Sequence, residues 1–268
     1  MKRDFSKKII SAVVAFGACV MLSAAILALT VGAVFSRPYF SLLTGNGYKA
    51  KVTGEVLSQL EGLAIPGGLP HDFFEQELDK ALLKKDIDRA VSAAFADKSV
   101  TFEAFSAATK QSVMRYAQEN NITVQAGDET AEENIDHLVS LCAKKYKILV
   151  NSEFIKFGGA ISRFLNPWCL IIAVVLGAIA AGLIIATHKI GGITYLRMAL
   201  GGAGIMLVLF PAYMLIFRNI TSLGITSSSM YALATGIIYS LLITLIVFAV
   251  ILLVLANLPY KKTKKSEE

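Results

Sequence analysis

Four long apolar segments dominate the sequence, and their length constrains the fold more than any other feature. Each has about 20 residues or more, which is enough for an α-helix to cross the roughly 30 Å of hydrocarbon in a bilayer. Hydrophobic residues make up 55% of the chain and are concentrated in these segments. The predicted transmembrane helices are 9–35, 167–187, 193–217 and 231–258. The sequence therefore predicts a multi-pass α-helical membrane protein.

Basic residues cluster at both ends of the chain. The N-terminal segment 1–8 contains four Lys and Arg residues, and the tail 259–268 contains four lysines. Four spans would place both termini on one side of the membrane, and the positive-inside rule makes that side cytoplasmic. The long region between the first and second spans, residues 36–166, would then be extracytoplasmic.

The region 36–166 is expected to fold as a helical domain. Its apolar residues recur at spacings of three and four, and no alternating run of β-branched residues is long enough to predict a strand. We therefore predict an all-α fold, in which an all-α extracytoplasmic domain is inserted between transmembrane helices 1 and 2 of a four-helix transmembrane bundle.

The first apolar segment, 9–35, also has features of a cleaved signal peptide, namely a basic start and a tolerable cleavage sequence at Val31-Gly32-Ala33. The apolar core of a secretory signal is typically about 7–15 residues long, and this one is nearly twice that length. The length favours an uncleaved signal anchor. Cleavage would instead leave three spans and an external N-terminus.

The net charge of +6 does not indicate nucleic-acid binding, because the excess lies at the termini. Residues 36–165 contain 15 basic and 17 acidic residues, so the expected domain is nearly neutral. The terminal clusters are suited to anionic lipid headgroups. The predicted partners are therefore the lipid bilayer and another protein of the envelope or membrane, and no nucleic acid.

Three cysteines are present, Cys19, Cys142 and Cys169, and only Cys142 lies well inside the expected domain. A domain of about 130 residues can fold without disulfides, and their absence favours a bacterial plasma membrane over a disulfide-rich animal ectodomain. Cys142 would be a redox sensor if it were exposed. Its place beside Leu138 and Val139 on an apolar stripe favours a buried, inert thiol.

Local signals predict where the helices of the domain begin and end. A first helix, about 47–63, ends at the breaker cluster 65–68, and Pro70 suits the first position of the next helix. A further helix, about 102–119, has Thr101 as its expected N-cap, and the capping box Thr130 to Glu133 opens the last one. The helix expected to begin at Pro70 should present one apolar face. The candidate interaction surface on it comprises Leu69, Pro70, Phe73, Phe74 and Leu78.

The run Gly68-Leu69-Pro70-His71-Asp72-Phe73-Phe74-Glu75, followed by Asp86-Ile87, carries a resemblance. It resembles a group of uncharacterised four-span membrane proteins of Gram-positive bacteria, in which a GLP-x-x-[VF]-F helix start lies in a helical extracytoplasmic domain between spans 1 and 2. The resemblance covers the architecture of most of the chain but only about ten residues of motif. It implies a bacterial plasma membrane location and a helical domain, and it transfers no active site.

The topology alone is also similar to that of FtsX-type cell-division permeases. Those proteins carry a charged cytoplasmic segment between spans 2 and 3 that docks an ATPase, whereas this chain has only the short connection His188 to Gly192. A membrane subunit of an ABC-type or FtsX-like transporter complex is therefore the alternative function.

No complete catalytic, cofactor or nucleotide-binding motif is present, and the four spans contain no Asp, Glu or Lys. Gly201-Gly202-Ala203-Gly204 lies within an apolar span and predicts close helix packing rather than phosphate binding. A metal-dependent enzyme would need His71 and His137 to converge with nearby carboxylates, and nothing in the sequence brings them together. We therefore predict no catalytic, metal or cofactor site. The predicted function is a non-enzymatic membrane protein whose extracytoplasmic domain mediates protein interaction or envelope sensing.

Overall fold

The computed structural model describes residues 2–120, 129–217 and 224–258. This part of the chain is α-helical and contains no strand, which confirms the all-α fold class. The helices are α1 (Lys2–Val34), α2 (Arg37–Leu43), α3 (Asn46–Ala64), α4 (Phe73–Glu77), α5 (Lys80–Ala96), α6 (Glu103–Glu119), α7 (Glu129–Val150), α8 (Glu153–Ile216) and α9 (Ser228–Asn257).

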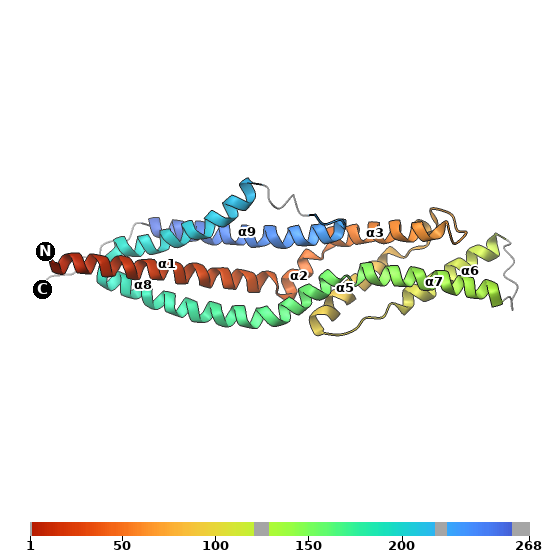
Figure 1. The fold of residues 1–268 in the computed structure, drawn as a ribbon, viewed down its shortest axis with the longest axis horizontal. Helices are drawn as coiled ribbons and strands as arrows, with labels where there is room; N and C mark the ends of the chain where they lie inside the picture. The colour runs from red at the N-terminus through yellow and green to blue at the C-terminus, as the bar shows by residue number, and fades with distance from the viewer. Residues whose placement is uncertain (1, 121–128, 218–223, 259–268) are drawn as a thin grey trace. The chain divides into compact units, whose positions relative to one another are not determined.

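The chain divides into two compact units (Figure 1). The first, here called the apolar unit, comprises residues 1–36, 164–223 and 235–268. The second, here called the polar unit, comprises residues 37–163 and 224–234. The boundaries fall within α8 and within the early part of α9, so each of these helices contributes residues to both units.

The apolar unit contains the helices that are long and apolar enough to cross a membrane. Candidate spans lie in α1, in α8 and in α9. Many of their large apolar side chains point outward, including Leu170, Ile171 and Leu209. Apolar surface on this scale is not found on soluble monomers and indicates contact with lipid. The protein is therefore a membrane protein.

Helix α8 is interrupted at Gly192. The backbone there has φ 74° and ψ −164°, a conformation that residues with a side chain rarely adopt. The chain reverses direction within α8 (Figure 1). As a result Leu183, before the break, and Ala199, after it, both belong to the cluster that surrounds Ala15 and Ala18 of α1. Residues 188–191, expected to form a connection, are helical up to the break.

Small residues allow α8 and α9 to approach each other closely, as the stripe 201–204 predicted. Ala203 is fully buried in a cluster with Leu245 and Ala249 of α9. A Cβ atom at Gly204 would lie 3.0 Å from the carbonyl oxygen of Ala249. The prediction of a packing surface is confirmed.

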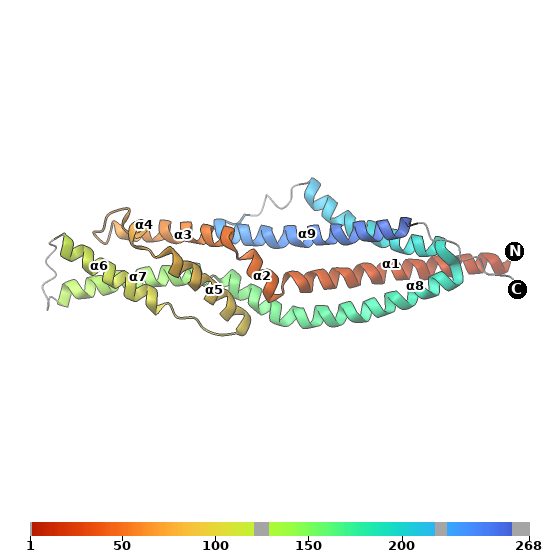
Figure 2. The same cartoon turned by 180° about the vertical axis from the view of Figure 1, so that it is seen from behind.

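In the polar unit, α3 and α6 pack against α7 (Figure 2). Helix α3 buries one face with a spacing of four residues, formed by Tyr48, Val52, Val56, Leu60 and Ala64. That regular spacing is typical of a helix with a single core-facing stripe. The observed bounds agree with the predicted helix 47–63.

The next predicted helix start was wrong. Pro70 lies before the helix, and α4 begins only at Phe73. The chain leaves the helical conformation again at Leu78, whose ψ is 117°. Asp79 then caps a new helix, because its carboxylate accepts hydrogen bonds from the amides of Ala81 (2.8 Å) and Leu82 (3.1 Å). A side-chain cap of this kind favours the start of a new helix at this point.

Two further expectations concern helix starts. Helix α6 has Phe102 at its N-cap position and no side-chain cap, so the prediction of Thr101 as the cap was wrong. The capping box at Thr130 remains a prediction, because the side chain of Thr130 lies outside the described residues.

Cys142 is fully buried, as the apolar stripe predicted. Burial raises the pKa of its thiol to about 11, so the thiol stays protonated and unreactive at neutral pH. Cys19, Cys142 and Cys169 are all free and buried.

Candidate functional site

The residues of the predicted interaction surface are mostly buried inside the polar unit. Phe73 and Phe74 are 5% and 2% exposed, and their rings meet edge to face with centroids 5.2 Å apart. Leu69 is also buried, whereas Pro70 and Leu78 are half-buried. An interaction surface at these positions stays a prediction, and its aromatic side chains are largely occupied by core packing.

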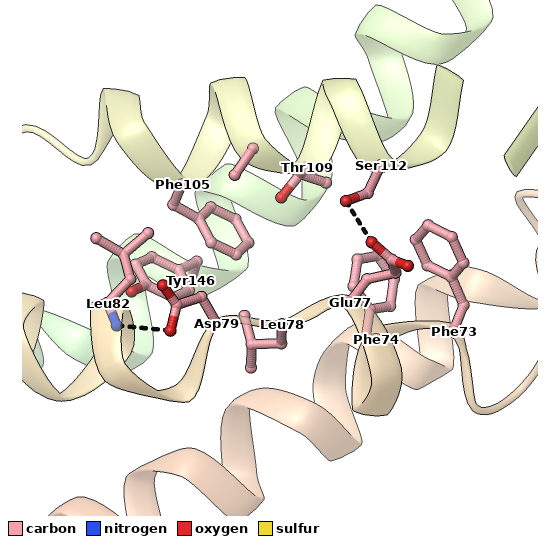
Figure 3. A pocket seen from close by; sticks show the side chains of 11 residues that line it. Phe73, Phe74, Glu77, Leu78, Asp79, Leu82, Phe105, Thr109, Ser112 and Tyr146 are labelled. Carbon is pink, nitrogen blue, oxygen red and sulfur yellow. Dashed lines mark hydrogen bonds between the residues drawn. The ribbon is translucent and has the colours of Figure 1, made fainter. Parts of the chain in front are cut away.

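Beside these residues lies a small cavity bounded by α4, α5, α6 and α7 (Figure 3). Phe74, Leu78, Phe105 and Tyr146 are among the side chains that line it. Its volume of about 20 Å³ is enough for about one water molecule. The cavity is therefore too small for an organic ligand unless the helices move apart.

Glu77 forms the polar edge of the cavity (Figure 3). Its Oε2 atom accepts a hydrogen bond from the hydroxyl of Ser112 at 2.7 Å and another from the guanidinium of Arg115. These contacts join the end of α4 to the middle of α6. The carboxylate is thus engaged in holding two helices together.

A buried carboxylate, Asp86, lies next to the cavity wall. Asp86 is 0% exposed, and its Oδ2 accepts a hydrogen bond from the hydroxyl of Tyr146 at 3.0 Å. Its other oxygen, Oδ1, accepts one from Arg89 Nη1 at 3.2 Å. A buried charge is tolerated only when it is paired and hydrogen-bonded, and Asp86 meets both conditions.

The ring of Tyr146 is fixed by aromatic contacts. It stacks on Phe105 with centroids 3.8 Å apart and an interplanar angle of 10°, and Phe102 meets it edge to face. Burial raises the pKa of the Tyr146 hydroxyl, and the negative charges of Asp86 and Asp79 raise it further. The hydroxyl therefore stays protonated and remains a donor to Asp86.

Sequence reasoning missed the role of Asp86. In the sequence, Asp86 stands out only as part of the resemblance motif. The structure shows that Leu83, Ile87 and Ala90 form a buried face of α5. The position of Asp86 three residues after Leu83 and four before Ala90 places it on that same buried face. A charged residue on a buried stripe predicts an internal partner.

The two histidines considered for a metal site, His71 and His137, are both exposed. His137 lies in an open groove with Pro66 and Leu138, and His71 is not among the residues of that groove. In residues 2–120, 129–217 and 224–258, no group of three His, Cys, Asp or Glu side chains is arranged to hold a metal ion.

A cluster of polar groups lies at the first turn of α9. Glu55 on α3 accepts hydrogen bonds on Oε1 from the hydroxyl of Ser227 and from the backbone amide of Ser229, each at 3.0 Å. The hydroxyl of Ser229 donates to Oε2. Ser227 also accepts a hydrogen bond from the amide of Met230 at 3.2 Å, so it is the N-cap of α9. We call this set of contacts the Glu55 clasp.

The charged form of Glu55 is favoured in the clasp. Burial by itself raises the pKa of the carboxyl, but the hydrogen bonds from Ser229, Ser227 and Ser228 outweigh it, and the pKa is lower than its ordinary value. The N-terminus of a helix also favours a negative charge. Nearby, burial raises the pKa of Tyr48 to about 12, with the Ser152 hydrogen bond lowering it and the Glu55 charge raising it.

The clasp is not visible in the sequence. Ser227 to Ser229 lie between the third and fourth predicted spans, 193–217 and 231–258. The serines before the apolar run are a recognisable N-cap signal. No local signal connects them to Glu55, which is more than 170 residues away along the chain.

Comparisons with known proteins found no matching family model, no matching curated protein and no matching solved structure. Function is therefore inferred from the residues themselves.

The hydrogen bond between Tyr146 and Asp86 can be tested by removing one hydroxyl. Tyr146→Phe leaves Oδ2 of a buried carboxylate without its donor, and we expect a loss of about 1–3 kcal/mol of stability. Tyr116→Phe is the matched control, because the ring of Tyr116 packs against Phe73 but its hydroxyl has no hydrogen-bond partner in the described part of the chain. Thermal unfolding of the full-length protein in detergent measures both. Equal melting temperatures for the two variants would contradict a stabilising role for the Tyr146 hydroxyl.

The clasp predicts a pH-dependent contribution to stability. Because the pKa of Glu55 is lower in the folded protein, its contribution is present above its unfolded pKa of about 4.3 and is lost as the pH falls through the folded value. At pH 7 we expect Glu55→Gln to lower the melting temperature by about 2–4 °C, which corresponds to about 1 kcal/mol. The difference from the wild type should shrink as the pH falls below the unfolded pKa and disappear below the folded pKa of Glu55.

Glu61→Gln is the control for this experiment. Glu61 lies on the same helix, but no described residue forms a hydrogen bond or ion pair with its side chain. It should melt like the wild type across the whole pH range. A Glu55→Gln variant that behaves in the same way as the control would show that the clasp does not stabilise the protein.

Proposed function

We propose that this protein is a multi-pass protein of a bacterial plasma membrane with four spans and both termini in the cytoplasm. The break of α8 at Gly192 supports counting its two apolar parts as separate spans, in addition to α1 and α9. The basic segments at the two ends of the chain support the cytoplasmic location of the termini. This arrangement makes the polar unit extracytoplasmic.

The polar unit acts, in this proposal, by binding another envelope protein or by sensing a condition of the envelope, without enzymatic chemistry. The polar side chains of its interior support this function. Asp86 is engaged by Tyr146 and Arg89, and Glu77 is engaged by Ser112 and Arg115. These side chains hydrogen-bond to one another and hold helices together.

The Glu55 clasp is the observation that carries the proposal. It joins α3, a helix of the polar unit, to the first turn of α9, a helix that continues into the apolar unit. A partner or condition that displaces α3 would remove acceptors from the amide and hydroxyl groups at the start of α9. A coupling of only 1–3 kcal/mol is typical of allosteric proteins, and a few charge-assisted hydrogen bonds can supply it.

The alternative, a membrane subunit of an ABC-type or FtsX-like transporter complex, has less support. Such a subunit needs a charged cytoplasmic segment to dock its ATPase. Between the two apolar parts of α8 the chain offers only His188 to Gly192, and residues 188–191 are helical.

The proposed topology can be tested with single cysteines and a membrane-impermeant maleimide on intact cells. Lys84→Cys, at an exposed position in the polar unit, should be labelled from outside, whereas Ser266→Cys, in the basic tail, should be labelled only after the membrane is permeabilised. The native cysteines are buried, so labelling of the wild type measures the background signal. Labelling of Ser266→Cys in intact cells would contradict the proposed orientation.

The interaction function can be tested by purifying the full-length protein in mild detergent after cross-linking in cells and identifying bound proteins by mass spectrometry. We expect a recurring envelope protein with the wild type and with Glu61→Gln, and at least about fivefold less of it with Glu55→Gln, since about 1 kcal/mol corresponds to that factor. A recurring cytoplasmic ATPase would instead support the transporter-complex function. Equal recovery of the partner with the wild type and both variants would show that the clasp does not affect partner binding.

A further inference from the structure

A groove in the polar unit is lined by four basic side chains. Lys98 follows α5, Lys147 lies in the last turn of α7, and Lys156 and Arg163 lie on α8. Asp97 is the acidic residue among those lining the groove. The groove offers about 400 Å³ of open space, which is enough for a small charged group. We call it the basic groove.

Close packing of α8 against the end of α5 forms one wall of the groove. Gly159 makes this possible, because a Cβ atom there would lie only 2.4 Å from the carbonyl oxygen of Ala94. One turn further along α8, Arg163 donates a hydrogen bond to that same carbonyl oxygen at 2.6 Å and forms an ion pair with Asp97 at 2.7 Å. Arg163 thereby caps the C-terminus of α5.

Two of the four basic side chains in the groove have no acidic partner among the described residues. Lys156 pairs with Glu153 at 2.6 Å. The ammonium groups of Lys98 and Lys147 have no hydrogen bond or ion pair with any residue that the structure describes. Ser99 and Asn151 also line the groove and can donate hydrogen bonds. Two unpaired cations with neutral donors beside them are suited to an anion with several oxygen atoms, such as a phosphate.

Two exposed apolar residues directly follow lysines of the groove in the sequence. Ile148 follows Lys147 and is 58% exposed, and Phe157 follows Lys156 and is 61% exposed. Along the sequence, Arg163 is followed within five residues by Trp168, which is also exposed. Basic residues beside exposed aromatic and aliphatic residues are typical of the membrane–water boundary, where lipid headgroups meet the acyl chains.

We propose that the basic groove binds the phosphate headgroup of an anionic phospholipid, with Lys98 and Lys147 as the principal contacts and Ile148 and Phe157 beside the acyl chains. The membrane is the source of this ligand. Free phosphate offers the same oxygen atoms but would gain nothing from the exposed apolar residues. This inference needs only a membrane-embedded protein and is independent of the Glu55 clasp.

Native mass spectrometry of the full-length protein in a neutral detergent can test the proposal, by counting bound lipids as phosphatidylglycerol is added. We expect Lys98→Gln/Lys147→Gln to bind the tightest phosphatidylglycerol at least about tenfold more weakly than the wild type. Lys84→Gln/Lys85→Gln, which removes the same charge from exposed positions on α5, should bind like the wild type. Phosphatidylcholine, whose headgroup has no net charge, should show no difference among the three proteins.

Two results would overturn the proposal. The first is equal phosphatidylglycerol binding by the groove variant and the wild type, because the basic termini, which are intact in all variants, would then account for the bound lipid. The second is a thermal stabilisation by inorganic phosphate that depends on Lys98 and Lys147, together with unchanged lipid counts. That result would assign the groove to a free anion instead.

Discussion

An apolar helix has free amide groups at its first turn, and these must find polar partners outside the hydrocarbon. In α9 the partners are Ser227, within the same segment, and Glu55, from a distant helix. The carboxylate satisfies a backbone amide and two hydroxyl groups at once, at the end of the helix where a negative charge is favoured. The start of α9 and the middle of α3 are therefore held by one charged group, and the stability of each depends on the other.

Polar groups in the interior of the polar unit also find hydrogen-bond partners, although they are more deeply buried than those at the start of α9. Its helices bury regular apolar stripes, and the polar groups that enter the core do so in matched sets. Asp86 is placed between a tyrosine hydroxyl that stays protonated and the guanidinium of Arg89. Breaking such a set leaves a charge without a partner, which costs more than the set contributes when it is intact. This interior is consequently a scaffold that fixes the helices of the polar unit against one another.

The sequence predicted those parts of the fold that depend on periodicity. The apolar segments, the helix 47–63 and the buried Cys142 all follow from spacing and length, which a single chain displays directly. The start of α4 was wrong because Pro70 is compatible with a helix start without requiring one, and the break at Leu78 depends on the hydrogen bonds made by Asp79. The Glu55 clasp and the basic groove could not be predicted. Their residues are brought together by the packing of helices far apart in the sequence, which no local pattern records.

The reversal at Gly192 has a consequence for the order in which the protein is assembled. Residues before and after the break both pack on Ala15 and Ala18, which belong to α1, a helix that leaves the ribosome before α8. The contact surface of α1 is thus complete before either part of α8 has been synthesised. With the turn made by a single glycine, the second part of α8 reaches the same surface as soon as it emerges, and α1 serves as a template for the hairpin.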